Sequence, residues 1–155
     1  MFRITRLTDY GVLLMTQLAK DTAEVHNAAA LADQVRVPLP TVSKILQILL
    51  HENLLESIRG AGGGYRLARR ATDISIRDII VALEGPIALT ECNREAGNCE
   101  QESHCTTRDN WHMINQAVRH ALGGISLDDM IQPNFSPLIR TEKPGTSTSK
   151  LRQAG

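Results

Sequence analysis

The chain has 155 residues, of which 42% are hydrophobic, and its 17 Lys and Arg residues balance 17 Asp and Glu residues. This length suits one domain, or a small domain with an appendage. No run of about 18 apolar residues occurs, which excludes a membrane-spanning helix, and the first residues lack a signal-peptide pattern, so we expect a cytoplasmic protein without a membrane partner.

The zero net charge hides regions of different sign. Residues 1–70 carry nine basic and six acidic side chains, residues 71–132 carry four and ten, and residues 133–155 carry four and one. Within the first region, residues 36–70 hold six basic side chains and only two acidic ones. A local surplus of this kind can bind a polyanion.

Three helices are expected at the start of the chain. Thr8 is the expected N-cap of the first, whose apolar residues recur at helical spacing up to Lys20. Asn27 can cap a short second helix, "AAALADQV". Pro40 suits the first turn of the third, "LPTVSKILQILLHENLL". Two short helices separated by a tight turn, after a longer one, form a helix-turn-helix pattern.

The glycine-rich stretch after these helices predicts a β-hairpin. "LLESIR" is typical of a strand, "GAGGG" of a turn and "YRLAR" of a returning strand. A glycine-rich loop can also bind the phosphate of a nucleotide, but that motif needs a helix directly after the glycines and a Lys-Ser/Thr pair. Neither feature is present, so the sequence favours a hairpin, and a hairpin after a recognition-type helix indicates a winged helix.

Two further helices and a final turn follow. Ser75 and Asp78 form a capping-box pattern for "IRDIIVALEG", and a long amphipathic helix is expected from Thr106 until Gly123. Ser126 can cap a last short helix.

The expected fold is therefore mainly α with a small β-hairpin. We expect a winged helix-turn-helix domain over residues 1–85 and a cysteine-containing loop over residues 86–105. The long helix and the short terminal helix occupy residues 106–132, and residues 133–155 have the composition of a flexible tail.

The candidate DNA-binding residues lie in the third helix and the hairpin. The N-terminal side chains of a recognition helix face base edges in the major groove, a wing arginine can enter a narrow minor groove, and further arginines can hold phosphates. Single exposed arginines are usually ordinary solvated charges, but six cations in one helix-and-hairpin layout favour duplex DNA. The candidates are Thr41, Ser43 and Lys44 in the helix, and Arg59, Arg66, Arg69 and Arg70 in and after the hairpin.

Three cysteines, Cys92, Cys99 and Cys105, fall within 14 residues. Six and five residues separate them, whereas zinc sites usually pair ligands through shorter gaps. Three thiolates on a long loop suit a soft metal or an iron–sulfur cluster that needs one more ligand. A metal-free redox pair and three ordinary reduced thiols are the alternatives.

Several runs together resemble the iron–sulfur-sensing winged-helix repressors that include IscR and NsrR. They are "RLTDYG", "RGAGGGYRLAR", "ISIRDIIVALEG" and the cysteines before "RDNWHMINQAV", and the likeness spans residues 1–132. "ALEGPIALTEC" and "RDNW" are most similar to the branch that regulates the SUF iron–sulfur assembly operon.

This resemblance implies a homodimer joined through the long helix and bound to double-stranded promoter DNA. It implies an iron–sulfur cluster on Cys92, Cys99 and Cys105, with a 2Fe–2S form favoured and a 4Fe–4S form possible, and it matches Arg59 to the family's wing arginine. The implied function is a cluster-sensing regulator, of the repressor type, of iron–sulfur assembly genes, with no enzymatic activity and no small-molecule substrate.

The chain departs from the family in its fourth ligand and its recognition helix. Arg108 stands where the IscR branch has a histidine ligand, whereas Asp9 matches the aspartate that the NsrR branch supplies from the partner subunit. Asp9 is therefore the first candidate, with His104 and His112 as others. Ser43 stands where the IscR branch has a base-reading glutamate, so the operator sequence is not carried over.

Two alternatives to this function stay open on the sequence alone. The cysteines can form a direct thiol switch without metal on the same DNA-binding domain, or the scaffold can carry a cluster to other proteins without binding specific DNA. An enzyme is disfavoured, because neither paired carboxylates nor a nucleophile–base arrangement is recognisable.

Overall fold

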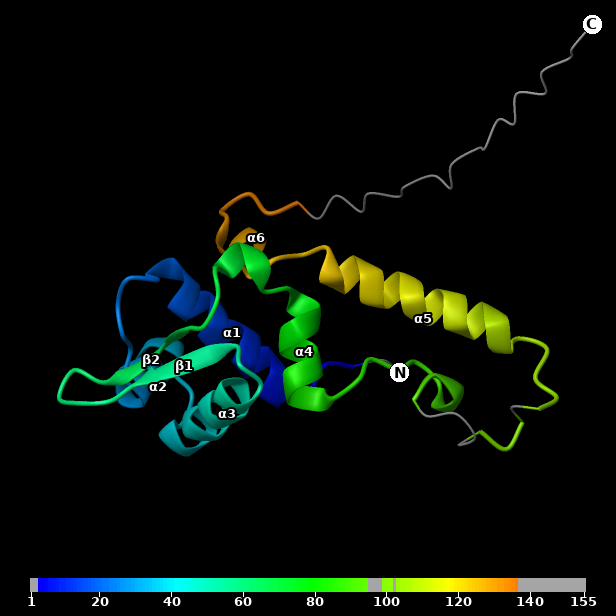
Figure 1. Cartoon of the computed structure of the whole chain (residues 1–155), viewed down its shortest axis with the longest axis horizontal. Coiled ribbons are helices and arrows are strands. Elements are labelled where there is room, and N and C mark those ends of the chain that lie inside the picture. Colours follow the sequence, from blue (N-terminus) through cyan, green and yellow to red (C-terminus); the bar gives the residue numbers. More distant parts are fainter. Residues whose placement is uncertain (1–2, 95–98, 102, 137–155) are drawn as a thin grey trace, which may run out of the picture.

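A computed structural model describes residues 3–94, 99–101 and 103–136, which form mainly helices and one hairpin (Figure 1). The helices α1, α2 and α3 come first, the strands β1 and β2 follow, and α4, α5 and α6 complete the fold with two short 3-10 helices, η1 and η2. Their bounds are α1 Arg6–Lys20, α2 Ala28–Val35, α3 Leu39–His51, β1 Leu55–Ile58, β2 Gly64–Leu67, η1 Ala71–Asp73, α4 Ile76–Glu84, η2 Glu91–Asn93, α5 Arg108–Gly123 and α6 Leu127–Ile131.

This architecture confirms the expected mainly α fold with a winged helix-turn-helix. Asn27 caps α2, and both Ser75 and Ser126 form complete capping boxes at α4 and α6. Of the tail expected to be flexible, residues 137–155 lie outside the described residues. None of the helices in the described part of the chain is both long and apolar enough to cross a membrane.

The expected N-cap of α1 was wrong. The cap is Thr5, whose hydroxyl accepts the Thr8 N–H at 3.3 Å, and Thr8 itself is fully buried inside the first turn. The reason is a tertiary contact, because the Thr5 N–H donates to a carboxylate oxygen of Glu84 at the end of α4, 2.9 Å away. Likewise α5 begins at Arg108, two residues after the expected start at Thr106.

The core lies between α1, α3 and α4, and α6 closes one end of it. Gly11 lets α1 and α4 approach closely, because a Cβ atom there would come within 2.2 Å of Leu83 Cδ1. At the other end of α4, the Ile76 N–H donates to the Ile125 carbonyl at 2.9 Å, and the Leu127 N–H donates to the Ile74 carbonyl at 2.7 Å. These contacts fasten both ends of α4 to neighbouring elements.

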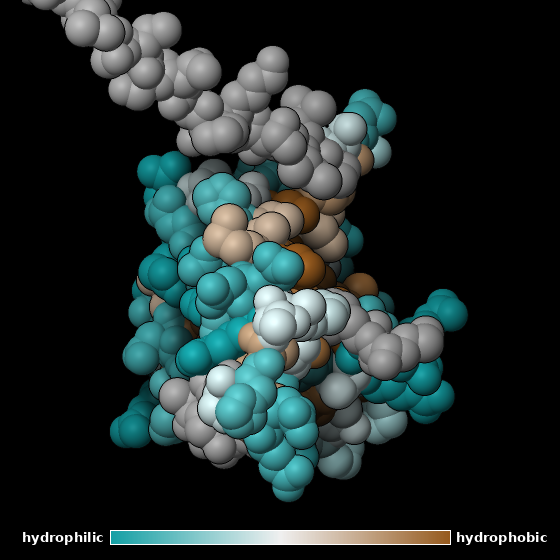
Figure 2. All heavy atoms as spheres, turned by 90° about the vertical axis from the view of Figure 1, so that its right-hand side faces the viewer, coloured by the Kyte–Doolittle hydropathy of each residue, from teal (hydrophilic) through white to brown (hydrophobic). Residues whose placement is uncertain are grey.

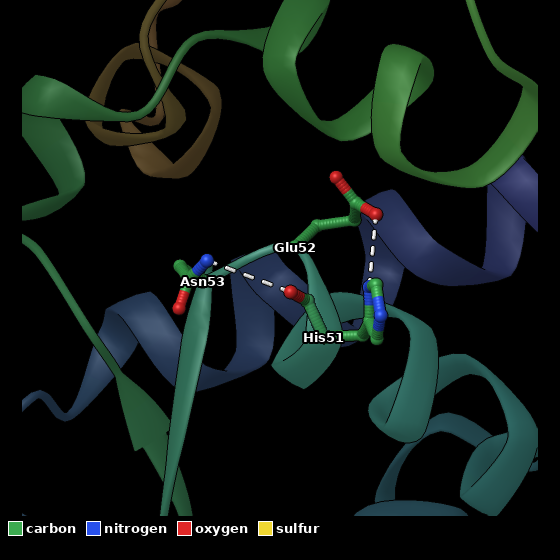
Figure 3. A network of polar contacts seen from close by, with 3 residues as sticks. All are labelled: His51, Glu52 and Asn53. Carbon is green, nitrogen blue, oxygen red and sulfur yellow. Dashed lines mark hydrogen bonds and ion pairs between the residues drawn. The ribbon is translucent and has the colours of Figure 1, made fainter.

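A tight turn leads from α3 into the hairpin (Figure 3). Asn53 adopts a left-handed conformation with φ of 57°, which asparagine tolerates better than most residues. Its side-chain amide donates to the His51 carbonyl at 3.5 Å, and the His51 ring contacts a Glu52 carboxylate oxygen at 3.2 Å. Both side chains of the His51–Glu52 pair are exposed, so the turn owes its direction to the backbone more than to that pair.

The helix α5 extends past the body of the molecule (Figure 1), and its far end lies toward the cysteine segment, residues 86–105, of which 86–94, 99–101 and 103–105 are described. Only one α5 residue, Asn115, is buried. Trp111, Met113 and Ile114 keep 39%, 67% and 45% of their surface exposed. Figure 2 looks onto this end of the molecule and shows hydrophobic surface in the middle, bordered by hydrophilic side chains. The apolar periodicity of α5 is therefore largely unused within one chain.

Candidate nucleic-acid interface and cysteine segment

The recognition-type helix α3 buries one face and leaves the other free. Its apolar residues Val42, Ile45, Leu46 and Leu49 are buried in the core. On the opposite face Lys44 is exposed, while Thr41 and Ser43 near the N-terminus are half-buried. The α2–α3 turn passes through Arg36 in a left-handed conformation, with φ of 55°, and Pro40 occupies the first turn of α3 without losing a helical hydrogen bond. The expected role of Thr41, Ser43 and Lys44 in reading bases stays a prediction.

The hairpin is held in a fixed register. Leu55 pairs with Leu67, and Glu56 pairs with Arg66, whose side chains also form an ion pair. Arg59 is exposed at the start of the turn. The turn requires glycine at position 63, where a Cβ atom would lie 2.4 Å from the carbonyl oxygen of Ile58. The exposed Arg59 therefore sits at the tip of a hairpin whose shape is set by its glycines.

The structure separates the last two basic candidates from the wing tip. Arg69 and Arg70 follow β2, at the opposite end of the hairpin from Arg59 (Figure 1). They line a hollow with Thr22 beyond α1 and Asp128 of α6, and Arg70 lies 3.8 Å from the Asp73 carboxylate. Their expected role in holding phosphates stays a prediction, as does that of Arg66, whose charge is already paired with Glu56.

Each cysteine is a free, half-buried thiol. Cys92 lies in η2, where its sulfur is 3.1 Å from the Thr90 hydroxyl, and the Cys105 sulfur is 3.4 Å from the Thr107 hydroxyl. Hydrogen bonds from the Thr107 hydroxyl and N–H, aided by Arg108, lower the pKa of the Cys105 thiol. The chemistry of the three cysteine side chains fits iron–sulfur ligation, because thiolates are the usual ligands of such clusters.

The described residues do not gather these thiols into a ligand sphere. Within residues 3–94, 99–101 and 103–136, no three His, Cys, Asp or Glu side chains lie together closely enough to hold one metal ion. Asp9 is exposed in the first turn of α1, and His104 is exposed next to Cys105. His112 is half-buried in α5, with Nδ1 2.6 Å from the Asn93 side-chain oxygen. The choice of a fourth ligand stays a prediction.

Polar contacts attach the cysteine segment to α5. The Asn115 side chain accepts the Leu89 N–H and donates to the Ile87 carbonyl, both at 3.1 Å. Farther along, the Asn93 side-chain amide donates to the Thr90 hydroxyl at 2.7 Å and to the Trp111 carbonyl at 3.3 Å. Sequence reasoning missed both asparagines. The one sequence signal was a short polar side chain among the apolar positions of α5.

The chain is similar to known proteins in sequence and in fold. Residues 4–133 match the Rrf2 family, described as "Iron-dependent Transcriptional regulator". The chain belongs to the Rrf2 family of transcriptional regulators. It is 33% identical over 131 residues to a helix-turn-helix-type transcriptional regulator of Neisseria meningitidis, an alignment that covers 84% of this chain and 88% of that protein.

Solved structures of Rrf2-type regulators share the fold. CymR of B. subtilis, the global cysteine regulator, has 30% identity and a TM-score of 0.68, over 84% of this chain and 97% of that one. IscR of T. potens has 27% identity and a TM-score of 0.65, over 84% and 86% of the two chains. This Rrf2 chain is accordingly a DNA-binding transcriptional regulator and not an enzyme.

Proposed function

We propose that this Rrf2 regulator is a homodimer that senses iron–sulfur cluster status through Cys92, Cys99 and Cys105. The observation that carries the proposal is the position of these thiols. They lie on the segment that joins α4, packed in the winged-helix core, to α5, and that segment is hydrogen-bonded to α5. The IscR likeness supports the same chemistry, and the proposed targets are genes of iron–sulfur cluster assembly.

The exposed apolar face of α5 supports the dimer. Met113 and Ile114 are large hydrophobic residues that one chain leaves in water, and their burial against a second copy is favourable. Two winged helices then meet two half-sites about one DNA turn apart, which a single wing with its small contact surface does not achieve. In that arrangement Thr41, Ser43 and Lys44 read the major groove, Arg59 enters the minor groove, and Arg66, Arg69 and Arg70 hold phosphates.

In this proposal, different residues of the chain bind the cluster, orient its ligands and connect it to α5. A bound cluster supplies a redox-sensitive link among its thiolate ligands, and Asp9 of the partner subunit is the proposed fourth ligand. Thr90 and Thr107 fix two of the sulfurs by hydrogen bonds. Asn93 and Asn115 connect the segment to α5, so a change in the segment alters how α5 sits against the winged helix. Such a change affects DNA binding only through the different affinities of the two arrangements for DNA.

Anaerobic purification tests the proposal. Wild-type protein is expected to show visible absorbance and to contain iron and sulfide, and Cys92→Ala is expected to abolish the absorbance and alter affinity for its operator. Ser103→Ala, an exposed change in the same segment, is the matched control and should leave both unchanged. An unchanged spectrum and unchanged affinity in Cys92→Ala would refute cluster sensing.

A metal-free thiol switch is the second candidate, supported by the likeness to CymR and by the three free thiols. In that case anaerobic protein is colourless and free of iron, and a thiol oxidant changes its mobility on operator DNA. The same preparation therefore distinguishes the two mechanisms.

A further inference from the structure

Tyr65 lies where three elements of the winged helix meet. Its backbone N–H donates to the His26 carbonyl at 2.8 Å, and the His26 N–H donates to the Tyr65 carbonyl at 3.0 Å. His26 directly precedes Asn27, the N-cap of α2. Through β2, Tyr65 also pairs with Ser57 of β1. One residue therefore joins both strands of the wing to the start of the helix-turn-helix.

The neighbouring residue shows how closely these backbones approach. A Cβ atom at Gly64 would lie 2.4 Å from the His26 carbonyl oxygen. Only glycine allows the wing to pass this near to the residue before α2. Gly64 is therefore required for the backbone bridge between Tyr65 and His26 to form.

The Tyr65 side chain adds a link to the third element. Its hydroxyl accepts a hydrogen bond from the Gln47 side-chain amide of α3, with 3.1 Å between nitrogen and oxygen. Gln47 follows Lys44 by three residues and Ser43 by four, so it lies on the same side of α3 as these two DNA-binding candidates. The bond therefore connects the wing to the exposed face of the recognition helix.

We propose that Tyr65 is a positioning residue for operator recognition, which fixes the wing relative to α3 through its hydroxyl contact with Gln47. This inference rests on the proposed function, in which Arg59 at the wing tip and the reading residues of α3 engage DNA at the same time. A fixed distance between them favours a sequence whose major-groove bases and minor-groove width occur at the matching spacing. Contacts to phosphates do not depend on that spacing in the same way, because phosphates recur along every duplex.

The physical consequence is an effect on specificity rather than on general affinity. One neutral hydrogen bond changes an equilibrium by about threefold to tenfold. Loss of the Tyr65 hydroxyl is therefore expected to reduce operator affinity by about that factor, while affinity for unrelated duplex DNA and the salt dependence of binding stay unchanged.

The test uses Tyr65→Phe in the full chain. The probe is a duplex that wild-type protein enriches from a random-sequence library, compared with a shuffled duplex of the same composition by anisotropy titration. The expected result is a loss of about threefold to tenfold in the ratio of the two affinities. Tyr10→Phe removes the same atom from the other tyrosine, in α1, and is expected to leave the ratio unchanged.

A second variant separates positioning from structural damage. Gln47→Met keeps the length of the side chain and removes the donor, and adding Tyr65→Phe to it is expected to lower the ratio by less than about twofold further, because the shared bond is already absent. Thermal unfolding checks that each variant folds. An unchanged ratio in Tyr65→Phe, or a full second reduction in the double variant, would overturn the proposal. So would a wild-type protein that enriches no sequence.

Discussion

Substitution of Asn115 by Ala tests how the cysteine segment is attached to α5. Asn115 is 4% exposed and is the only buried residue among the described residues of α5. The change removes two hydrogen bonds of 3.1 Å and leaves the Leu89 N–H and the Ile87 carbonyl without these partners. A typical net hydrogen bond contributes about 1 kcal/mol, and an unsatisfied buried group costs about 1–3 kcal/mol. We therefore expect the contact between α5 and residues 87–89 to be weakened by about 2–4 kcal/mol.

The assay is urea unfolding at one fixed protein concentration, because a dimer's stability depends on concentration. Trp111 is the one tryptophan of the chain and lies on α5, four residues before Asn115, so its fluorescence reports this contact. Asn115→Ala is expected to move the fluorescence midpoint to lower urea, and to move it more than the circular-dichroism midpoint, which is dominated by the other helices. Gln116→Ala, at the next and exposed position of α5, is the control and should move neither.

Asn115→Asp sharpens the same test. An ionised carboxylate still accepts the Leu89 N–H, but it sets a second oxygen against the Ile87 carbonyl where the amide donated. The variant should therefore be destabilised near neutral pH and should recover as acid protonates the carboxyl and restores a donor. Equal fluorescence midpoints for Asn115→Ala and wild type would refute the attachment, and so would a pH-independent Asn115→Asp variant.

Three other predictions concern the winged helix and its packing against α4. Gly11→Ala sets a methyl group against Leu83 and should cost about 1–3 kcal/mol in thermal unfolding; an unchanged melting temperature would show that the α1–α4 packing yields easily. Arg59→Ala should weaken DNA binding and flatten the plot of log affinity against log salt by about 0.9 for each phosphate that Arg59 neutralises in the wild-type complex, and an identical slope would show that Arg59 neutralises no phosphate. Burial by itself raises the pKa of Glu84, but hydrogen bonds from Thr8 and Thr5 outweigh it and lower the pKa. Because the folded-state pKa lies below the unfolded one, Glu84 stabilises the fold above the ordinary carboxyl pKa, and this advantage over Glu84→Gln should fade as pH falls through the lowered pKa. A stability difference that is the same at every pH would contradict this assignment.

The sequence predicted the parts of the fold that depend on neighbouring residues. Capping boxes, helix spacing and a glycine-rich turn are local patterns, and the Asn27, Ser75 and Ser126 caps were all confirmed. The cap of α1 was misplaced because its position depends on Glu84, 79 residues away from Thr5 in the chain. Local patterns carry no information about such a partner.

In the functional sites too, local patterns could be predicted from the sequence, whereas contacts between distant residues could not. The sequence predicted α3 and the wing as a DNA-binding unit from their charge and order, but the bond between Gln47 and Tyr65 bridges 18 residues and depends on how the hairpin folds back. The hydrogen bonds of Asn115 could not be predicted either, because helical periodicity assigns a residue to a face of the helix but does not identify the groups that it contacts. For the cysteines, spacing predicted the chemistry of the donors, whereas their arrangement in space does not follow from spacing.

The contacts of α4 determine how a signal from the cysteine segment can reach DNA. Gly11 packs against Leu83, and Glu84 holds the N-cap of α1, so the C-terminal half of α4 is fastened to the winged helix. The Arg77 side chain of α4 reaches Gly123 at the end of α5, where a Cβ atom would lie 3.0 Å from the guanidinium. The far end of α5 contacts the rest of the chain through residues 87–93. In the proposed dimer joined through α5, we therefore expect a change in that segment to move α5 relative to the winged helix and to alter the spacing of the two wings rather than the shape of either.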